Sequence, residues 1–304
     1  MSEIKNEPSG VLIVNKHAGC TSHDIINKIR RLYGTKRVGH TGTLDPMATG
    51  VLVVLVGRAA KAEEYLQPGK KGYRATLRLG LTTDTEDTTG TVLTTCDSLP
   101  AEGEVAATCE GFVGRIEQIP PMYSALKVGG RKLVDIARAG GEVERKARPV
   151  EIYSLDCKPT DAASDYILDV ECSGGTYIRT LCADIGAALG CGGAMASLER
   201  TETCGFRIEQ SHTVDELTEM TESEREALLI PTESLFEDCP VVTLPEFFEK
   251  LCRGGCEIYQ KKIGTQHEVG TRVRLYGKGG FFALGEVREY ENGTAIKSIK
   301  MFSI

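Results

Sequence analysis

One loop of the sequence brings a carboxylate together with residues that let the backbone approach a ligand. Asp45 precedes Pro46, and proline pushes the residue before it into an extended conformation. The same loop holds Gly39, Gly42 and Gly50, where a bound molecule can come close to the chain. This combination predicts a carboxylate presented into a cleft, and an ionised carboxylate can act as a nucleophile or as a base.

Two other interpretations of this loop remain. Asp45 can turn back and cap its own backbone, as in an Asx-type turn. A glycine-rich loop can also cradle a phosphate, but neither GxxxxGK[ST] nor GxGxxG occurs in it, so the sequence disfavours nucleotide binding. The loop alone therefore leaves the catalytic and the purely structural interpretation open.

Regular elements are predicted on both sides of the loop. Before it, Ser22 can cap a helix whose apolar residues, from Ile25 to Leu32, form one face, and Gly34 ends this helix. After it, the apolar run 51–56 is short, β-branched and bounded by glycine, which predicts a buried strand.

The rest of the chain alternates between strand and helix patterns. Residues 73–79 alternate as a strand with a basic outer face, which suits a sheet edge near RNA and is equally well explained by solubility. Residues 81–99 are polar and acidic, which predicts turns, and 213–228 predict an exposed acidic helix. Further strands are expected over 166–172, 271–276, 281–288 and 295–302, a helix over 178–189, and a basic excursion from the core over 126–149.

These patterns predict an α+β fold in two domains. Mixed strands and helices fill residues 1–235, and short strands separated by glycine turns fill residues 240–304. We therefore expect a small all-β, barrel-like unit at the C-terminal end, with a boundary within 230–245.

The composition excludes several protein classes. The longest apolar run has six residues, far below the roughly 20 that span a bilayer, and residues 1–10 contain no signal-peptide core. Eleven Cys without a CxxC pair predict a reducing cytoplasm rather than a disulfide framework. Five scattered His without HExxH give no indication of a metal site.

Positive charge is concentrated locally although the net charge is −7. Residues 16–40 hold six Lys or Arg against one acid, residues 127–148 seven against three, and residues 250–304 ten against five. Residues 208–249 hold twelve acids against Arg225 alone. Because polyanion binding depends on the local basic surface, a nucleic-acid partner stays possible, with solvated surface faces as the alternative.

Several motifs, in order, resemble those of one enzyme family. The segment from Val38 to Leu52, VGHTGTLDPMATGVL, resembles the signature of the bacterial TruB family, the tRNA pseudouridine synthases that act on the T-loop uridine. The tail from about residue 240 resembles, more loosely, the RNA-binding PUA module of such enzymes. The other matching blocks are Lys16–Ser22, Lys71–Ala75, Asp84–Asp87, Gln118–Lys127, Ala147–Val150 and Ser173–Leu181.

Two positions depart from the family pattern. Asn15-Lys16-His17 stands where the family usually has Asp-Lys-Pro, so the rigid proline is lost. Glu199 occupies a position that is often basic, which would reduce the affinity for RNA.

The resemblance implies a fold and a reaction. The fold is a mixed, largely antiparallel sheet flanked by helices, followed by the PUA module. The reaction turns uridine into pseudouridine on a flipped-out nucleotide: the C1′–N1 bond breaks, uracil rotates, and C5 joins C1′. Atoms are only rearranged, so we expect no cofactor and no metal.

The resemblance also implies three catalytic residues, Asp45, Tyr73 and Arg179. Asp45 would attack C1′ or take a 2′ proton, and Arg179 would keep it ionised through a bidentate pair. Tyr73 would stack on the flipped uracil, because a tyrosine with an ordinary pKa near 10 is a poor base. The alternatives are a core aromatic for Tyr73 and a surface helix-start residue for Arg179.

Four further residues are expected at the substrate. By resemblance, Tyr177 and Leu198 line the base pocket, although core packing also explains Leu198. His40 would occupy the gap that the flipped base leaves. Lys16 would support the loop or meet a phosphate.

The expected partner is the T-stem-loop of tRNA. The resemblance predicts a cytoplasmic, monomeric enzyme that acts without a guide RNA, because guide-dependent relatives carry longer basic terminal extensions and this chain ends at Ile304. The alternative from a different class is a non-catalytic RNA-binding or tRNA-folding protein that uses the same surface.

Overall fold

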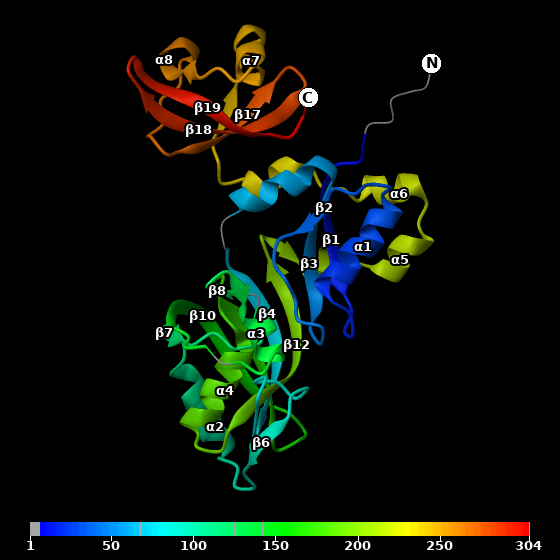
Figure 1. Cartoon of the computed structure of the whole chain (residues 1–304), viewed down its shortest axis with the longest axis vertical. Coiled ribbons are helices and arrows are strands. Elements are labelled where there is room, and N and C mark those ends of the chain that lie inside the picture. The colour runs from blue at the N-terminus through cyan, green and yellow to red at the C-terminus, as the bar shows by residue number, and fades with distance from the viewer. Residues whose placement is uncertain (1–6, 67–68, 125, 142, 304) are drawn as a thin grey trace.

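The chain forms a ten-stranded mixed sheet followed by a separate five-stranded sheet (Figure 1). This architecture comes from a computed structural model, and residues 7–66, 69–124, 126–141 and 143–303 are described. The main path of the large sheet runs β14-β1-β3-β12-β4-β11-β10-β7, with β2 paired to β3 and β13 paired to β12. The expected α+β class is confirmed.

The first half of the large sheet is buried on both faces. It contains β1 (Gly10–Lys16), β2 (Val38–His40), β3 (Thr49–Val56) and β14 (His212–Thr213). Alternate residues of β3, Leu52 to Val56, pack with α1 (Ser22–Leu32), and the intervening ones, Val51 to Leu55, pack with η1 (Gly57–Tyr65) and the C-terminal sheet. Burial on both faces explains why the run 51–56 is continuously apolar.

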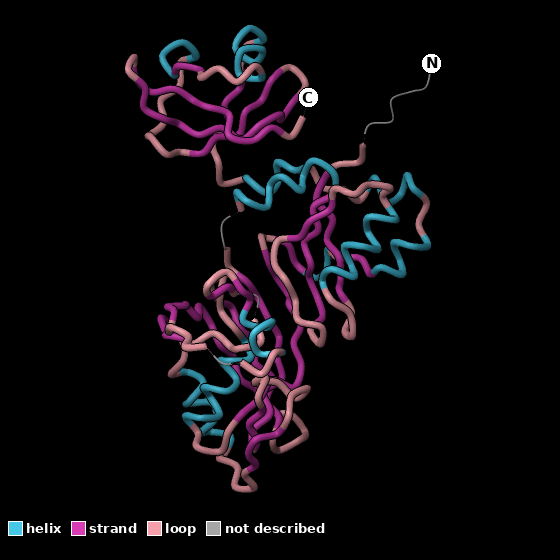
Figure 2. Tube along the Cα trace, viewed as in Figure 1, coloured by secondary structure: helices cyan, strands magenta, loops and turns pink. Residues whose placement is uncertain are grey.

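The second half of the large sheet is antiparallel. It contains β4 (Lys71–Leu79), β11 (Asp165–Cys172), β10 (Arg148–Pro159) and β7 (Gly114–Gln118). Two helices, α2 (Glu102–Glu110) and α4 (Ile178–Ala188), pack on this half, away from α1 (Figure 2). Their shared core buries one face of each strand.

Strand β12 (Gly193–Thr203) joins the two halves. It pairs with β4 along most of its length and meets β3 in parallel at two positions only, Glu199 with Thr49 and Arg200 with Gly50. Gly50 has φ +97°, and a Cβ there would lie 2.3 Å from the Arg200 carbonyl oxygen. Only glycine permits this approach, so the junction between the halves is tight.

The basic outer face of β4 does not mark a sheet edge, contrary to that expectation. Strand β4 is central, between β12 and β11. Arg74 lies 2.7 Å from Asp169 and Arg78 lies 2.6 Å from Asp165, both on β11. Cross-strand acids therefore neutralise these arginines.

Three local predictions were also wrong. The cap of α1 is Thr21, which forms a capping box with Asp24, and not Ser22. The polar stretch 81–99 contains a hairpin of β5 (Leu81–Thr83) and β6 (Val92–Thr95). The acidic stretch 213–228 forms two helices, α5 (Val214–Glu219) and α6 (Glu222–Ala227), because each has its own capping box and α5 buries Val214 and Leu217.

The five-stranded sheet lies at the C-terminal end, in the order β15-β17-β18-β19-β16. The expected strands are present as β17 (Arg272–Gly277), β18 (Gly280–Tyr290) and β19 (Gly293–Met301), with β15 (Val241–Thr243) and β16 (Ile258–Tyr259) beside them. The unit is not all-β, because it also contains α7 (Glu246–Arg253) and α8 (Gln260–Ile263).

The C-terminal sheet is fixed to the large sheet by polar and apolar contacts. Tyr65 in η1 donates a hydrogen bond to the Ile299 carbonyl at 3.1 Å, and Arg272 donates to the Tyr65 carbonyl at 2.9 Å. Leu284 and Phe302 share an apolar cluster with Phe236 in η3 (Thr232–Phe236). The two sheets are therefore packed against each other rather than merely tethered.

The described part of the basic excursion contains three short elements. These are β8 (Lys127–Val128), β9 (Arg131–Lys132) and α3 (Leu133–Arg138). The remaining elements are β13 (Phe206–Arg207) and η2 (Ile208–Gln210). Within the described ranges, no helix is long and apolar enough to cross a membrane.

Candidate active site

Residues 41–48 form a loop between β2 and β3 that is held in place by hydrogen bonds from the segment 16–22. The Leu44 amide donates to Ser22 Oγ at 2.9 Å, and this hydroxyl lies 3.2 Å from the Leu44 carbonyl. The Gly19 amide donates to the Pro46 carbonyl at 2.9 Å. Ser22 was expected only as a helix cap, whereas it fixes the residue immediately before Asp45.

Lys16 lies under the same loop. Its Nζ donates to the carbonyls of Ala48 at 2.7 Å and Pro46 at 3.3 Å, and its side chain is buried. Burial lowers the pKa of Lys16, and these acceptors compensate for part of the lost hydration. Lys16 therefore supports the loop in this geometry, and contact with a phosphate stays a prediction.

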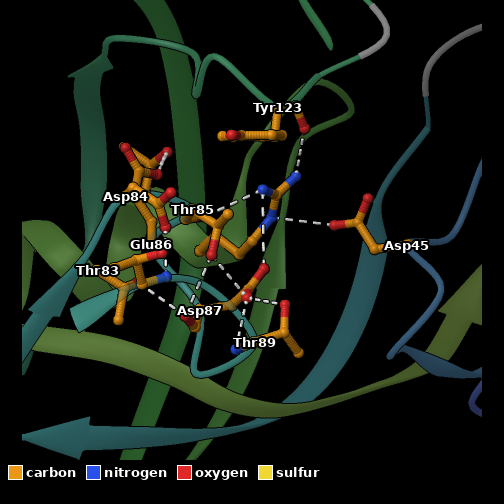
Figure 3. A network of polar contacts seen from close by, with 11 residues as sticks. Asp45, Thr83, Asp84, Thr85, Glu86, Asp87, Thr89 and Tyr123 are labelled. Carbon is orange, nitrogen blue, oxygen red and sulfur yellow. Dashed lines mark hydrogen bonds and ion pairs between the residues drawn. The ribbon is translucent and has the colours of Figure 1, made fainter. Parts of the chain in front are cut away.

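The carboxylate of Asp45 faces Arg179 across the cleft (Figure 3). Asp45 Oδ2 lies 3.0 Å from Arg179 Nε, and the aspartate side chain is 38% exposed against 6% for the arginine. This cross-cleft contact differs from the Asx-turn alternative, in which the carboxylate would cap its own backbone. Arg179 is not a surface residue, contrary to the other alternative.

The expected bidentate pair is not formed. Arg179 Nη1 donates to the Thr85 carbonyl at 3.1 Å, and Nη2 donates to the Tyr123 carbonyl at 2.9 Å. These carbonyls hold both ends of the guanidinium, and its Nε lies 3.0 Å from Asp45 Oδ2. The two carbonyls therefore fix the orientation of the guanidinium, which meets Asp45 as an ion pair through Nε.

The loop 83–89 forms the back of the Arg179 site. Asp87 Oδ2 lies 3.9 Å from Arg179 Nη1, while its Oδ1 accepts hydrogen bonds from the hydroxyl of Thr85 at 2.8 Å and the amide of Thr89 at 3.0 Å. Glu86 has a left-handed backbone, with φ +63°, and accepts from the Thr180 hydroxyl at 2.6 Å. These contacts involve residues of the block Asp84–Asp87, and they explain why that block is polar.

A cavity of about 410 Å³ opens beside this ion pair. Asp45, Tyr73, Tyr177, Arg179 and Leu198 all line it, so the structure brings together five of the seven predicted site residues. Its volume lies within the usual range for small-molecule pockets. Lys16 and His40 are not among its lining residues.

Tyr73 lies on β4 with its side chain buried. Burial is the main cause that raises the pKa of Tyr73 above its ordinary value, and the charge of nearby Arg200 opposes it. A tyrosine with a raised pKa is a weaker acid, so its phenolate is scarce at neutral pH. The ring therefore serves better as a wall of the cavity than as a base.

His40 lies at the end of β2, next to the loop. Its Nδ1 accepts a hydrogen bond from the Gly42 amide at 3.2 Å. Burial, followed by the charge of Arg200, lowers the pKa of His40. This favours a neutral imidazole held against the loop backbone.

Two basic residues near the loop were missed. Arg200 on β12 is almost fully buried, and its Nε and Nη2 donate to the carbonyls of Val51 at 2.7 Å and Gly42 at 3.1 Å. Lys71 on β4 lines the cavity. Lys71 belongs to the matching block Lys71–Ala75 of the sequence. A buried arginine on a strand, in contrast, gives no signal in the hydrophobic pattern.

Family models match most of the chain. One for the "TruB family pseudouridylate synthase (N terminal domain)" matches residues 30–178, and one for the "tRNA pseudouridylate synthase B C-terminal domain" matches 179–237. A tRNA pseudouridine synthase B of Alkaliphilus oremlandii is 40% identical over 96% of this chain and 98% of its own length. This chain belongs to the TruB family. A tRNA pseudouridine synthase B of Thiobacillus denitrificans is 42% identical over 94% of both chains.

Solved structures agree with this assignment. The TruB family chain resembles one in a structure titled "Crystal Structure of a Cbf5-Nop10-Gar1 Complex", with TM-score 0.72 and 26% identity over 96% of this chain and 84% of that one. A second, titled "Crystal structure of the archaeal box H/ACA sRNP Nop10-Cbf5 complex", gives TM-score 0.70 at 23% identity, covering 97% and 86% of the two chains, and supports the fold alone. The expected pseudouridine synthase fold is confirmed.

TruB membership confirms the predicted enzyme class. The chain is an isomerase that converts uridine to pseudouridine in tRNA. The non-catalytic alternative is not favoured, because relatives that match this chain over nearly their whole length are named as synthases.

Proposed function

We propose that this chain isomerises the T-loop uridine of tRNA, at position 55, with Asp45 as the catalytic carboxylate. One observation carries the proposal: the Asp45–Arg179 contact of 3.0 Å lies at a cavity that Tyr73 and Leu198 also line. A carboxylate beside a base-sized pocket is what a reaction at the ribose needs.

Asp45 acts on the ribose of a nucleotide that has left the RNA stack. It either attacks C1′ or removes the 2′ proton, and in both routes the C1′–N1 bond breaks. Uracil then turns and C5 bonds to C1′, as the Asp45–C1′ bond breaks in the first route or as Asp45 returns the proton to C2′ in the second. The C5 proton is then lost, and N1 gains a proton. Arg179 pairs with the carboxylate and orients it throughout, because its other two nitrogens are fixed on carbonyls.

The remaining site residues position the nucleotide. Tyr73 stacks on the uracil, and Tyr177 and Leu198 complete the pocket. His40 takes the place of the extruded base in the RNA, and Lys16 keeps the loop of Asp45 in register.

RNA contacts extend to both sides of the cavity. The described part of the basic excursion, residues 126–149, contributes Val134 to the cavity lining, which places α3 beside the proposed substrate. We place the catalytic domain at residues 1–235 and a PUA-like RNA-binding domain at residues 240–304, starting near the first strand of the C-terminal sheet.

We also propose that the protein acts as a monomer, in the cytoplasm and without a guide RNA. The Asp45–Arg179 pair and the residues around the cavity lie within one chain, so a second copy need not supply a residue to this cavity. All eleven cysteines are free thiols, which supports a reducing compartment.

The test is incubation of the protein alone with an RNA that contains only the T-stem and T-loop. Mapping should place pseudouridine at the T-loop uridine, and an RNA with cytidine at that position should stay unmodified. Modification that requires an added guide RNA, or that falls at another uridine, would contradict the proposal.

A further inference from the structure

Two positively charged nitrogens converge on one open point beside the loop of Asp45. A Cβ built on Gly42 would lie 3.7 Å from Arg200 Nη1 and 3.9 Å from Lys71 Nζ. Apart from Gly42 and its chain neighbours, no other heavy atom of the described residues lies within 4 Å of this point. Gly42 has φ +131°, so the loop needs glycine there and leaves the space between the two cations unfilled.

Both groups keep donors available at this point. Arg200 uses Nε and Nη2 for the carbonyls of Val51 and Gly42, and its side chain also hydrogen-bonds with Tyr73. No carbonyl of the described chain accepts a hydrogen bond from Nη1. The side-chain ammonium of Lys71 has neither a hydrogen bond nor an ion pair with any described residue, although its charge is close to that of Arg200. Its neighbour Lys70, in contrast, lies 2.6 Å from Glu171.

This convergence is electrostatically unfavourable in the free protein. Burial lowers the pKa of Lys71, and the charge of Arg200 lowers it further. The described chain places no carboxylate between the two groups to offset their repulsion, as Asp45 and Asp87 do for Arg179. An anion at this point would remove the repulsion and satisfy both donors.

The position identifies the anion that the substrate brings. Lys71 lines the same cavity as Asp45 and Tyr73, and Gly42 precedes Asp45 by three residues. A nucleotide whose ribose meets Asp45 carries a phosphodiester on each side of that ribose. We propose that Lys71 and Arg200 bind a phosphate oxygen of the phosphodiester adjacent to the target uridine, an inference that rests on the proposed placement of that nucleotide in the cavity.

The first test separates binding from chemistry. Single-turnover rates against enzyme concentration give both the dissociation constant for a T-stem-loop RNA and the rate of the chemical step. Lys71→Met keeps the aliphatic stem and should weaken binding at least about tenfold, the effect of losing one charge-assisted hydrogen bond. The slope of log affinity against log salt should fall by about one, with the chemical rate within about threefold of wild type.

Two variants serve as controls. Lys71→Arg keeps the charge and should bind within a few-fold of wild type, which excludes a folding defect at this strand. Lys70→Met removes the neighbouring charge, which Glu171 already pairs, and should leave the dissociation constant unchanged.

The second test finds the phosphate. Stem-loops with a single neutral methylphosphonate at each linkage near the target uridine should reveal one adjacent linkage where wild type loses about tenfold in affinity and Lys71→Met loses nothing. An unchanged dissociation constant in Lys71→Met would overturn the proposal. Equal sensitivity of wild type and Lys71→Met to the methylphosphonate at every linkage would also overturn it. A loss confined to the chemical rate would overturn it too, because it would place the Lys71 charge at the uracil. Asp45→Asn tests the proposed function separately, because its loss of turnover does not depend on Lys71.

Discussion

Asp45 and Asp87 share one guanidinium. Asp45 Oδ2 lies 3.0 Å from Arg179 Nε, and Asp87 Oδ2 lies 3.9 Å from Arg179 Nη1. Only Asp45 is substantially exposed, with 38% of its side chain accessible against 8% for Asp87. The buried aspartate and the backbone carbonyls therefore hold the arginine, and the exposed aspartate is left for the substrate.

Asp45→Asn should abolish turnover and leave RNA binding within about tenfold, roughly 1.4 kcal/mol. The amide keeps the size of the side chain and can still hydrogen-bond, but it is neither a nucleophile nor a base. Pseudouridine mapping after long incubation measures turnover, and filter binding measures affinity. Pseudouridine formed by the purified variant would exclude Asp45 from the reaction.

Arg179→Lys should lose most activity although the charge is conserved. The arginine contacts Asp45, the Thr85 carbonyl and the Tyr123 carbonyl in three different directions, and one ammonium group cannot reproduce that planar arrangement. The loss should fall on the single-turnover rate, with the affinity for RNA nearly unchanged. An unchanged single-turnover rate with a weakened affinity for RNA would instead indicate that Arg179 binds the RNA.

Ser22→Ala should reduce the chemical rate without removing any group from the cavity. The serine hydroxyl pairs with the amide of Leu44 at 2.9 Å, and its loss leaves a buried donor unsatisfied, at a cost of about 1–3 kcal/mol. Loop 41–48 would then hold Asp45 less firmly. Thr21→Ala is the matched control, because it removes the helix cap and leaves the loop contact in place. Equal rate losses in the two variants would contradict a specific effect on the loop.

The pH–rate profile should show no basic limb from Tyr73 below about pH 10. Burial raises the pKa of this phenol above its ordinary value, so the group stays protonated throughout the usual assay range. Single-turnover rates of wild type and Tyr73→Phe between pH 6 and 10 would test this. A basic limb in wild type that disappears in the phenylalanine variant would show that the hydroxyl titrates during catalysis.

Asp184→Asn should stabilise the protein near neutral pH and have little effect near pH 4. Burial, followed by the charge of Glu86, raises the pKa of Asp184 from 3.8 to about 6. The folded state thus binds a proton more tightly than the unfolded state, so this carboxylate destabilises folding increasingly as pH rises from 4 to above 6. The gain should be about 1 kcal/mol, since the side chain is only half-buried and solvent screens it.

Urea unfolding at pH 4 and pH 7.5 measures this difference. Asp161→Asn, at an exposed bend, is the control for removing a surface carboxylate, and Asp184→Asn should gain more stability than this control at pH 7.5. A stabilisation of Asp184→Asn that is equal at both pH values would contradict the titration argument.

The sequence predicted most strands because alternation and apolar runs are local features, whereas the residues of the cavity were predicted from the family resemblance. Alternation over 73–79 and the apolar run 51–56 reflect burial on one face and on both faces, and both appear as strands. The proline and glycines around Asp45 shape a loop without reference to the rest of the chain. The helices after residue 240 were missed because they have only eight and four residues, too few to show a clear helical periodicity.

The contacts that orient the site were not predictable in the same way. Arg200 binds the carbonyls of Val51 and Gly42, about 150 residues earlier in the chain, and nothing in its own neighbourhood marks it as buried. The single Nε contact of Arg179 depends equally on distant carbonyls, those of Thr85 and Tyr123. Such long-range backbone contacts leave no periodicity in the sequence.

The narrow junction between the two halves of the large sheet has a consequence for how activity can be lost. Asp45 belongs to the half that contains β3, and Arg179 to the half that contains β4 and α4, which the chain builds as an insertion between η1 and β13. Neither half alone contains the ion pair. The cavity and the ion pair both combine residues of the two halves, so activity depends on how the halves are joined. A side chain at Gly50 would clash with the backbone of Arg200 and separate Asp45 from Arg179, even if each half kept its own fold.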